Sequence, residues 1–472
     1  MNIVNYIILL TLLHFFGLTA ICKSNALPNL IIILTEDQGY HDVGFNGSQD
    51  ISTPNLDSIA SNGVRFTSGY VASPLSSPSR AGLLTGRYPA RFGYEHDTPW
   101  QPNNPLSGLP LTESTLADTL GKVGYASGMI GKWHLGASPV MHPLQRGFSE
   151  FFGFLGAGHP YFPEEVTIDE TRKVKTEYDS WLLEIMRNYD LVKTTNYLTD
   201  ALSDAAVDFV VRHKKQPFFL LLAYNAPHAP LEATEKYLSR FPKILGHNRR
   251  AYAAMMSSVD DGVGNLLAEL GKDGLVEQTL LVYLSASGGS LDANSSDNYP
   301  LRGSKNYPWE GGWRVPFAMQ WPGHLPKGIV YHQPVLSLDI YATITAVANA
   351  PVAPEVLLDG VNLVPYLTGQ KTGTPHDTIY LRMPDQTALA VRSGGYKLVV
   401  STTGQTAELY DLKHDIAELK NLADAKPEVM KELQKKGAAW SQQMMSSIFH
   451  GTIERNDPQP IDTDSGRLKT GR

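Results

Sequence analysis

Three unbroken apolar runs dominate this chain and restrict the folds that it can adopt. They are "LIIIL" (30–34), "PFFLLLAYN" (217–225) and "TLLVYLSAS" (279–287). A strand with one face in water alternates apolar and polar residues, whereas an unbroken branched run is typical of a strand buried on both faces. A shorter run, "YASGMIGKW" (125–133), precedes another glycine-rich turn. The chain is therefore expected to hold several strands inside one covered sheet.

Helical patterns separate these runs, at 114–124, 194–213 and 251–274. The alternation predicts an α/β fold with a largely parallel central sheet flanked by helices. In such sheets, ligands bind beyond the carboxyl ends of the strands. The residues that follow each run are therefore the first candidates for a site.

The pattern of predicted secondary structure changes after residue 345, where turn-rich segments are followed by short strand patterns and one helical pattern. We expect one large domain over 27–345, a small C-terminal α+β subdomain over 346–445 and a polar tail over 446–472. A chain of 472 residues is long enough for this organisation.

The first residues are typical of an export signal. Residues 4–21 are mostly apolar, and Ser24-Asn25-Ala26 follows the pattern of a cleavage site. We predict a signal peptide over 1–26 and a periplasmic or secreted protein with no stable membrane span after cleavage; a retained anchor is the alternative. Cys22 is the only cysteine, so the mature chain would contain neither disulfides nor thiolate sites.

The net charge of −7 argues against nucleic acid as a partner, because no global basic field is present. Cations are instead gathered locally. In "SPLSSPSRAGLLTGR" (73–87), three serines directly precede Arg80 at the expected start of a helix. A helix N-terminus and a guanidinium together suit a tetrahedral anion. The alternative is a serine-rich helix cap closed by Gly86.

Polar residues also follow the predicted strands. Glu36 and Asp37 follow the first run, which suggests a site for a hard cation, although helix capping or a solvated turn is the alternative. Lys132 and His134 follow another run and would point to the same face if the chain there were extended.

Further basic residues lie after other strands or in loops. His228 follows the run that ends near Tyr224, and Lys305 lies in a glycine-rich aromatic loop. Each alone has a structural alternative, a buried histidine or a solvated lysine. Together with the cations named above, they predict an anion-binding pocket.

The stretch "SSPSRAGLLTGR" (76–87) resembles the signature of the type I, formylglycine-dependent sulfatases, and it matches every fixed position in the serine form. Further segments such as "GKWHLG", "YNAPHAPL" and "EGGWRVPFAMQWPG" are similar to sulfatase segments in the same order, from about residue 28 to 424. The resemblance implies membership of the alkaline-phosphatase-like superfamily, with 27–345 as the catalytic domain.

The resemblance also implies a chemistry. A serine-type maturase would oxidise Ser76 to formylglycine, whose hydrated form attacks sulfur and forms a sulfated intermediate. His134 would assist proton transfer, and a calcium ion would lie between the nucleophile and the strand-end carboxylates. The residues that it implies for holding the sulfate are Arg80, Lys132, His228 and Lys305.

The expected calcium site departs from the family pattern. Glu36-Asp37 stands where the family has two aspartates, and Ala286 and Ser287 stand where it has an aspartate and an asparagine. The implied ligands are then Glu36, Asp37, Ser76 and Ser287, with a weakened or atypical calcium ion. Asp292 or Asp297 could supply a ligand; otherwise lysine and arginine supply the charge, or the enzyme is degenerate.

We therefore expect an exported sulfatase that acts on a sulfated polysaccharide or oligosaccharide. The alternative is a degenerate sulfatase that binds sulfated glycans without turnover, and a phosphatase or phosphonate hydrolase of the same superfamily is a third possibility. Four aromatic residues could stack on sugars or simply pack in the fold: Trp100, Tyr161, Trp309 and Trp313.

Overall fold

The computed structural model describes residues 27–401 and 406–449. The predicted signal peptide and residues 450–472 of the predicted tail lie outside this part of the chain. Within it, no helix is both long and apolar enough to cross a membrane.

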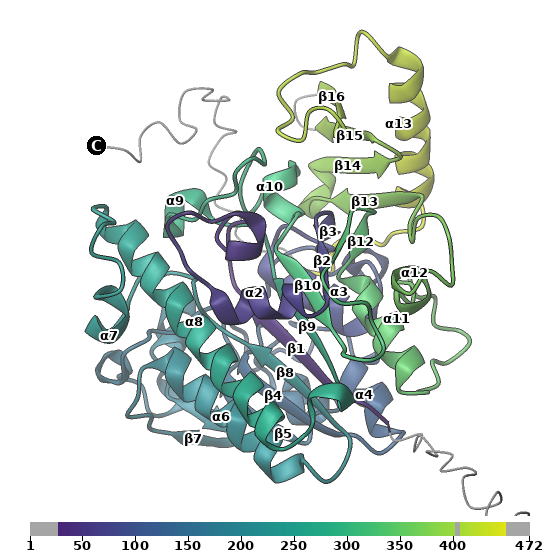
Figure 1. The fold of residues 1–472 in the computed structure, drawn as a ribbon. Coiled ribbons are helices and arrows are strands. Elements are labelled where there is room, and N and C mark those ends of the chain that lie inside the picture. The colour runs from purple at the N-terminus through teal and green to yellow at the C-terminus, as the bar shows by residue number, and fades with distance from the viewer. Residues whose placement is uncertain (1–26, 402–405, 450–472) are drawn as a thin grey trace, which may run out of the picture.

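A ten-stranded sheet forms the centre of the described structure, as Figure 1 shows. Its order is β11-β2-β10-β9-β1-β8-β4-β5-β6-β7, and the five neighbours from β9 to β5 are parallel. The pairs at both ends are mostly antiparallel. The strands are β1 (Asn29–Thr35), β2 (Val64–Phe66), β4 (Ala126–Lys132), β5 (Glu150–Phe154), β6 (Ile185–Arg187), β7 (Asp190–Val192), β8 (Phe218–Ala223), β9 (Thr279–Ser285), β10 (Phe317–Gln320) and β11 (Ile329–Tyr331). The prediction of a largely parallel sheet is confirmed.

Strand β1 shows why the apolar runs are unbroken. Leu30, Ile32 and Leu34 belong to one hydrophobic core, while Ile31 and Ile33 belong to the other. Because successive side chains point to opposite faces of a sheet, a strand between two cores must be apolar at every position.

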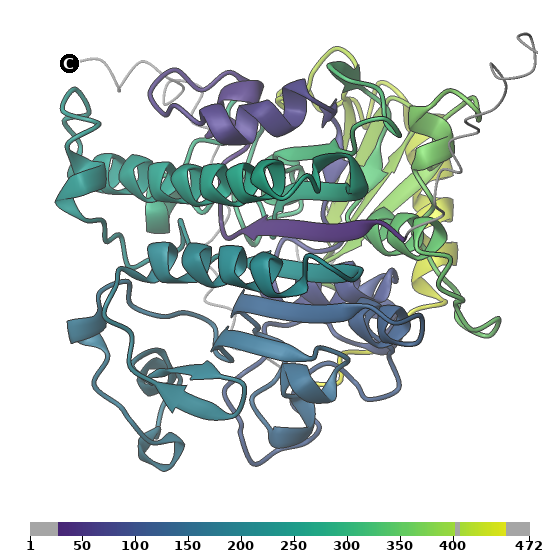
Figure 2. The same ribbon diagram turned by 60° about the horizontal axis from the view of Figure 1, so that its bottom comes forward.

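Helices cover both faces of the sheet (Figure 2), and the three predicted helices are present as α4, α6 and α8. One core contains residues of α3 (Ser76–Thr85), α4 (Leu116–Gly121) and α11 (Leu338–Val347). The other contains residues of α2 (Pro54–Ser61), α6 (Leu198–His213) and α8 (His247–Lys272). This is the covered α/β architecture that the sequence predicts.

Shorter elements connect this framework. Strands β3 (Gly69–Tyr70) and β12 (Val335–Leu336) form a small parallel pair. The short α-helices are α5 (Glu177–Trp181), α7 (Glu235–Leu238), α9 (Leu291–Asn294), α10 (Glu310–Trp313) and α12 (Val364–Leu367). One-turn 3-10 helices lie at Gly44–Asn46, Pro89–Phe92, Pro139–Met141, Pro143–Gln145, Pro163–Glu165, Thr171–Lys173, Val276–Gln278 and Pro384–Gln386.

The C-terminal region is an antiparallel sheet with one helix, which confirms the predicted α+β character. The sheet consists of β13 (Thr378–Arg382), β14 (Ala388–Ser393), β15 (Tyr396–Ser401) and β16 (Thr406–Asp411), and α13 (Pro427–Ser441) packs beside it (Figure 1). Ile379 and Leu381 of β13 extend the core of the large sheet, whereas Leu433 of α13 packs with the opposite face. The small sheet is therefore fixed to the main body by apolar packing.

Candidate active site

All nine residues that the sequence analysis assigns to a site lie together beyond the carboxyl ends of the parallel strands. Residues after β1, β4, β8 and β9 meet residues from the start of α3 and from the loop over 302–313. We call this group the strand-end cluster: Glu36, Asp37, Ser76, Arg80, Lys132, His134, His228, Ser287 and Lys305.

Helix α3 begins at Ser76, and the N-cap residue Leu75 provides no side-chain cap. No serine caps the start of the helix, so that part of the alternative is wrong, whereas Gly86 does end the helix in the left-handed conformation with a φ of +69°. The Ser76 hydroxyl lies 3.3 Å from Arg80 Nε and 3.4 Å from His134 Nδ1. The neighbouring Ser77 instead donates a hydrogen bond to the His134 carbonyl at 2.7 Å, which holds the helix start against the end of β4. Adjacent serines thus have different tasks: one faces the cluster and one positions the helix.

Glu36 is fully buried and contacts two cations. Arg80 Nη2 donates to one carboxylate oxygen, and Lys132 Nζ lies 3.2 Å from the other. Burial alone would raise the pKa of Glu36, but Lys132, Arg80 and Lys305 hold it well below its usual range. Glu36 is therefore an ionised anchor that holds a guanidinium and an ammonium side by side.

Asp37 has a matching role on the other side of the cluster. Lys305 Nζ lies 2.8 and 2.9 Å from its two carboxylate oxygens, and the Ser287 hydroxyl donates to Oδ1 at 2.9 Å. Asp37 has a φ of +56°, a strained conformation for a residue with a side chain, of the kind that accumulates at functional sites. The strand end is therefore held in a conformation that aims this carboxylate at Lys305.

Close backbone packing brings Lys305 to this position. The Gly288 amide donates to the Gly312 carbonyl at 3.0 Å, and the Lys305 amide donates to the Gly289 carbonyl at 3.0 Å. A Cβ atom on Gly288 would lie 1.8 Å from the Gly311 carbonyl oxygen, so glycine is required there. The glycine-rich loop over 302–313 therefore packs directly against the residues that follow β9.

Both histidines of the cluster are neutral at pH 7. Burial lowers the pKa of His134 well below its usual range and lowers that of His228 to about 4. His228 Nδ1 lies 2.6 Å from the Ala229 carbonyl, which assigns the ring proton to Nδ1 and turns Nε2 toward Asp37 at 3.8 Å. His134 has a φ of +56°, so the extended chain considered for Lys132 and His134 is not present, although both side chains reach the cluster.

The strand-end cluster does not fit the calcium ion that the family resemblance implies. In residues 27–401 and 406–449, no three acidic, histidine or cysteine side chains are arranged to hold a metal ion. Glu36 and Asp37 are already in contact with cations, and the Ser287 hydroxyl gives its proton to Asp37. The metal set of Glu36, Asp37, Ser76 and Ser287 stays a prediction, and its oxygens in this arrangement contact ammonium, guanidinium and hydroxyl donors, which does not suit calcium.

The two acids considered as replacement ligands do not enter the cluster. Asp292 is exposed on α9, and Asp297 lies 3.0 Å from His41 Nδ1. Between them, Asn294 is fully buried, and its Nδ2 donates to the Asp37 carbonyl at 2.9 Å. Asn294 therefore supports the strained strand end, a role that its place in a polar loop does not indicate.

Two further residues near the cluster were missed. Asp97 accepts a hydrogen bond from the Ser77 amide at 2.8 Å, beside the start of α3. The Trp181 ring packs edge-on against His228, with ring centres 5.7 Å apart. Because Asp97 lies in a loop and Trp181 ends helix α5, both far along the chain from the strands, no sequence pattern links them to the strand ends.

The four candidate sugar-stacking aromatics divide into two groups. Tyr161 and Trp313 are at most 1% exposed and belong to the core, so stacking on a sugar is the wrong interpretation for them. Trp100 and Trp309 are half-buried. Lys305 and His228 keep 12% and 15% of their side chains exposed, compared with 1% for Lys132. Lys305 and His228 are therefore more exposed to solvent than Lys132 is.

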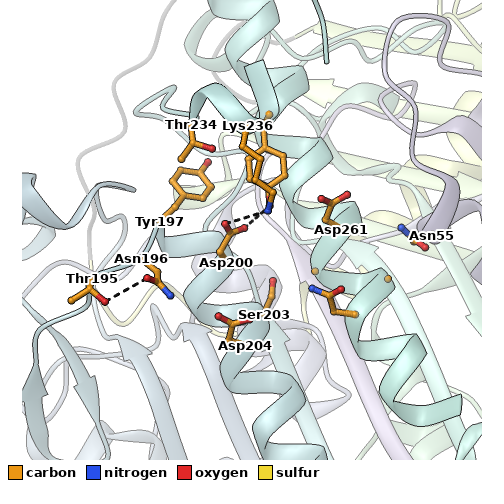
Figure 3. Close-up of a pocket in the computed structure, with 14 residues that line it drawn as sticks. Asn55, Thr195, Asn196, Tyr197, Asp200, Ser203, Asp204, Thr234, Lys236 and Asp261 are labelled. Carbon is orange, nitrogen blue, oxygen red and sulfur yellow. Dashed lines mark hydrogen bonds and ion pairs between the residues drawn. The ribbon is translucent and has the colours of Figure 1, made fainter. Parts of the chain in front are cut away.

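A separate cavity of about 880 Å³ lies between α6 and α8 (Figure 3). Asp200 and Asp204 of α6 and Asp261 of α8 line it, and none of the nine cluster residues does so. Lys236 also lines the cavity and lies 3.7 Å from Asp200, and Asp261 pairs with Arg240 at 2.7 Å. The cavity therefore has fewer cations to offer an anionic ester than the strand-end cluster has.

Comparisons with known proteins agree on one family. A model described as sulfatase matches residues 28–350, and a model of the C-terminal region of N-sulphoglucosamine sulphohydrolase matches residues 304–443. The chain is 34% identical to N-acetylgalactosamine-6-sulfatase of Mus musculus, over 78% of this chain and 71% of that protein. It is 30% identical to the uncharacterised sulfatase YdeN of Escherichia coli (strain K12), over 86% of this chain and 84% of that protein.

A solved structure supports the same assignment. The structure of Ps i-CgsB in complex with k-i-k-neocarrahexaose aligns with a TM-score of 0.84 and 38% sequence identity. The alignment covers 89% of this chain and 94% of that chain. Both the main body and the C-terminal region are therefore shared with this protein.

Proposed function

The chain belongs to the sulfatase family of the alkaline-phosphatase-like superfamily, and from that premise we propose that it is an exported enzyme that hydrolyses the sulfate esters of a sulfated carbohydrate. The observation that carries this proposal is the gathering of Arg80, Lys132 and Lys305 at the strand ends, where Arg80 also contacts the Ser76 hydroxyl. Three cations in one cluster suit the transfer of an anionic group. The predicted signal peptide supports a periplasmic or secreted location.

The substrate class is supported by the named relatives. N-acetylgalactosamine-6-sulfatase acts on a sulfated sugar by its name, and the 38% identical structure holds k-i-k-neocarrahexaose. We infer that the substrate here is likewise a sulfated oligosaccharide or polysaccharide. The family match favours sulfate over phosphate or phosphonate as the ester.

Ser76 is the position at which the family signature places the modified residue, and formylglycine there supplies a hydrated aldehyde that attacks sulfur. Arg80 orients the group at position 76 from 3.3 Å and neutralises a sulfate oxygen beside it. Lys132 and Lys305, fixed by Glu36 and Asp37, balance the charge that moves when the S–O bond breaks. Neutral His134 can accept a proton at Nδ1, which lies 3.4 Å from the Ser76 hydroxyl.

The modification state of residue 76 tests this proposal. When the full-length protein is co-expressed with a serine-type maturase, we expect a peptide in which residue 76 has lost one H₂. That protein should hydrolyse sulfated oligosaccharides, and Ser76→Ala should show no turnover under the same conditions. Ala286 and Ser287 favour the alternative of a glycan-binding pseudoenzyme. Formylglycine without hydrolysis across a panel of sulfated glycans would support that alternative instead.

The rate should also depend on the protonation of Lys132. Burial lowers the pKa of Lys132 to about 8, although Glu36 beside it acts in the opposite direction. Below pH 8 the side chain is charged and binds the sulfate; above pH 8 it becomes neutral and that attraction is lost. We expect kcat/KM, which reports the free enzyme, to fall as pH rises through about 8.

Lys132→Arg is the matched control for this pH dependence, since a guanidinium stays charged throughout the range. Whatever its absolute activity, this variant should not show the decline near pH 8. A wild-type kcat/KM that is constant through this range would contradict the role given to Lys132.

A further inference from the structure

The carboxylates of the strand-end cluster are all in contact with protein cations, and of their four oxygens only Glu36 Oε1 accepts no hydrogen bond. Asp37 Oδ1 receives Lys305 Nζ at 2.8 Å and the Ser287 hydroxyl at 2.9 Å, and Oδ2 receives Lys305 Nζ at 2.9 Å. Glu36 has one oxygen on Arg80 and the other 3.2 Å from Lys132 Nζ. A calcium ion takes six to eight oxygen ligands, usually several of them carboxylates, so it would have to displace two ammonium groups and a guanidinium.

The neighbouring strand end offers no replacement. Ala286 carries a methyl group that is 1% exposed and belongs to the hydrophobic core, and Ser287 is fully buried and acts as a donor. The amide oxygen of Asn294 accepts the Ser296 amide at 3.2 Å, so that oxygen is also engaged. The side chains around Asp37 therefore present hydrogen-bond donors or apolar groups to the position that a cation would need.

The charges in direct contact are consistent with this donor set. Two carboxylates, Glu36 and Asp37, contact three cations, Arg80, Lys132 and Lys305. The buried carboxyl group of Asp97 also interacts electrostatically with Lys132 and Lys305. A divalent cation would add two positive charges beside carboxyl groups that already have three protein cations as partners.

We propose that this chain binds and hydrolyses sulfate esters without a bound divalent cation, and that the ammonium group of Lys305 neutralises Asp37 in place of calcium. The proposal rests on the proposed function only for the identity of the anion. It is specific to this chain, because it follows from Ala286, Ser287 and the contacts of Lys305.

The first test measures metal binding by the wild-type full chain in the absence of substrate. Both the Ser76 form and the formylglycine form are titrated with calcium chloride in a calorimeter, dialysed and analysed for metal content. Their thermal unfolding is followed in calcium and in a chelator. We expect no stoichiometric calcium and no shift of the unfolding midpoint in either form. One calcium per chain, with a midpoint that falls in chelator, would overturn the proposal.

The second test restores the family ligands with Ala286→Asp plus Ser287→Asn. A ligand that binds only the folded state raises its stability, so calcium should raise the unfolding midpoint of this variant by a few degrees. The control is Ala286→Asn plus Ser287→Asn, which has the same size without the new charge and should gain nothing. If the folded acidic variant also gains nothing, residues 286 and 287 are not the cause, and the inference is overturned.

Hydrolysis in chelator separates this inference from the proposed function. We expect turnover of a sulfated oligosaccharide by the formylglycine form to be the same in chelator and in calcium. Turnover that requires calcium would overturn the inference and leave the sulfatase assignment intact. Absence of turnover in both buffers would count against the proposed function, while the metal measurements would still decide the inference.

Discussion

Replacing Arg80 by methionine should lower kcat/KM for sulfate ester hydrolysis by roughly 10²–10³-fold or more. Arg80 is 3% exposed, and its guanidinium contacts the Ser76 hydroxyl at 3.3 Å, the Lys132 carbonyl at 2.6 Å and the Glu36 carboxylate. Methionine retains much of the apolar packing but removes the charge and the fork of donors. Steady-state kinetics on formylglycine-containing protein measures the effect.

The same substitution leaves Glu36 with one cation in place of two, so a loss of stability of about 1–3 kcal/mol is expected as well. Glu36→Gln combined with Arg80→Met removes one buried negative and one buried positive charge, but it leaves the Lys132 ammonium without its carboxylate partner. We expect the double variant to remain inactive and not to regain the full stability of the wild type. If the double variant regains hydrolysis, or if the single variant stays within about tenfold of the wild type, Arg80 does not hold the sulfate.

Replacing Lys397 by methionine should destabilise the fold by about 3–5 kcal/mol, because it leaves two buried carboxylates without their ammonium partner. Lys397 is fully buried, with its Nζ 3.0 Å from Glu310 and 2.8 Å from Glu418. Burial would raise the pKa of Glu310, but Lys397, Arg314 and Arg392 together lower it to about 2. An ionised Glu310 therefore depends on the cations around it.

This buried network joins the C-terminal sheet to the site. Lys397 lies on β15, whereas Glu310 begins α10 in the same loop that carries Lys305. Loss of Lys397 should therefore raise KM for the sulfate ester in addition to lowering the urea midpoint. The control is Lys431→Met, which removes an exposed ion pair with Glu428 at 3.2 Å and should cost less than about 1 kcal/mol. Equal urea midpoints for the two variants would show that the buried network adds nothing.

Much of the fold follows from local sequence patterns. Unbroken runs such as 30–34 indicate strands buried on both faces, and the structure places β1 between two cores. The alternation with helices predicts the parallel sheet, and the polar residues after each run indicate where the site lies. These predictions succeed because the periodicity of apolar side chains, which shows which faces are buried, can be recognised within a few consecutive residues.

The sequence alone could not decide how the charges of the site are paired. Asp37 and Lys305 are 268 residues apart, and only the seating of a glycine-rich loop on β9 brings them within 2.9 Å. The same topology removes Asp292 and Asp297 from the cluster and supplies Asn294 instead.

Burial is the second property that only the tertiary structure decided. Tyr161 and Trp313 are aromatic residues of the kind that bind sugars on a protein surface, but both lie in the core. Lys397 and Glu418 are charged residues of the kind usually found in solvent, but both are fully buried. Residue types at the strand ends thus predicted an anion-binding pocket by themselves, and the resemblance of residues 76–87 to the family signature pointed to Ser76. Whether a carboxylate there faces a metal ion or an ammonium group depends on which distant segments pack beside it, because electrostatic pairing is set by distance in space and not by separation along the chain.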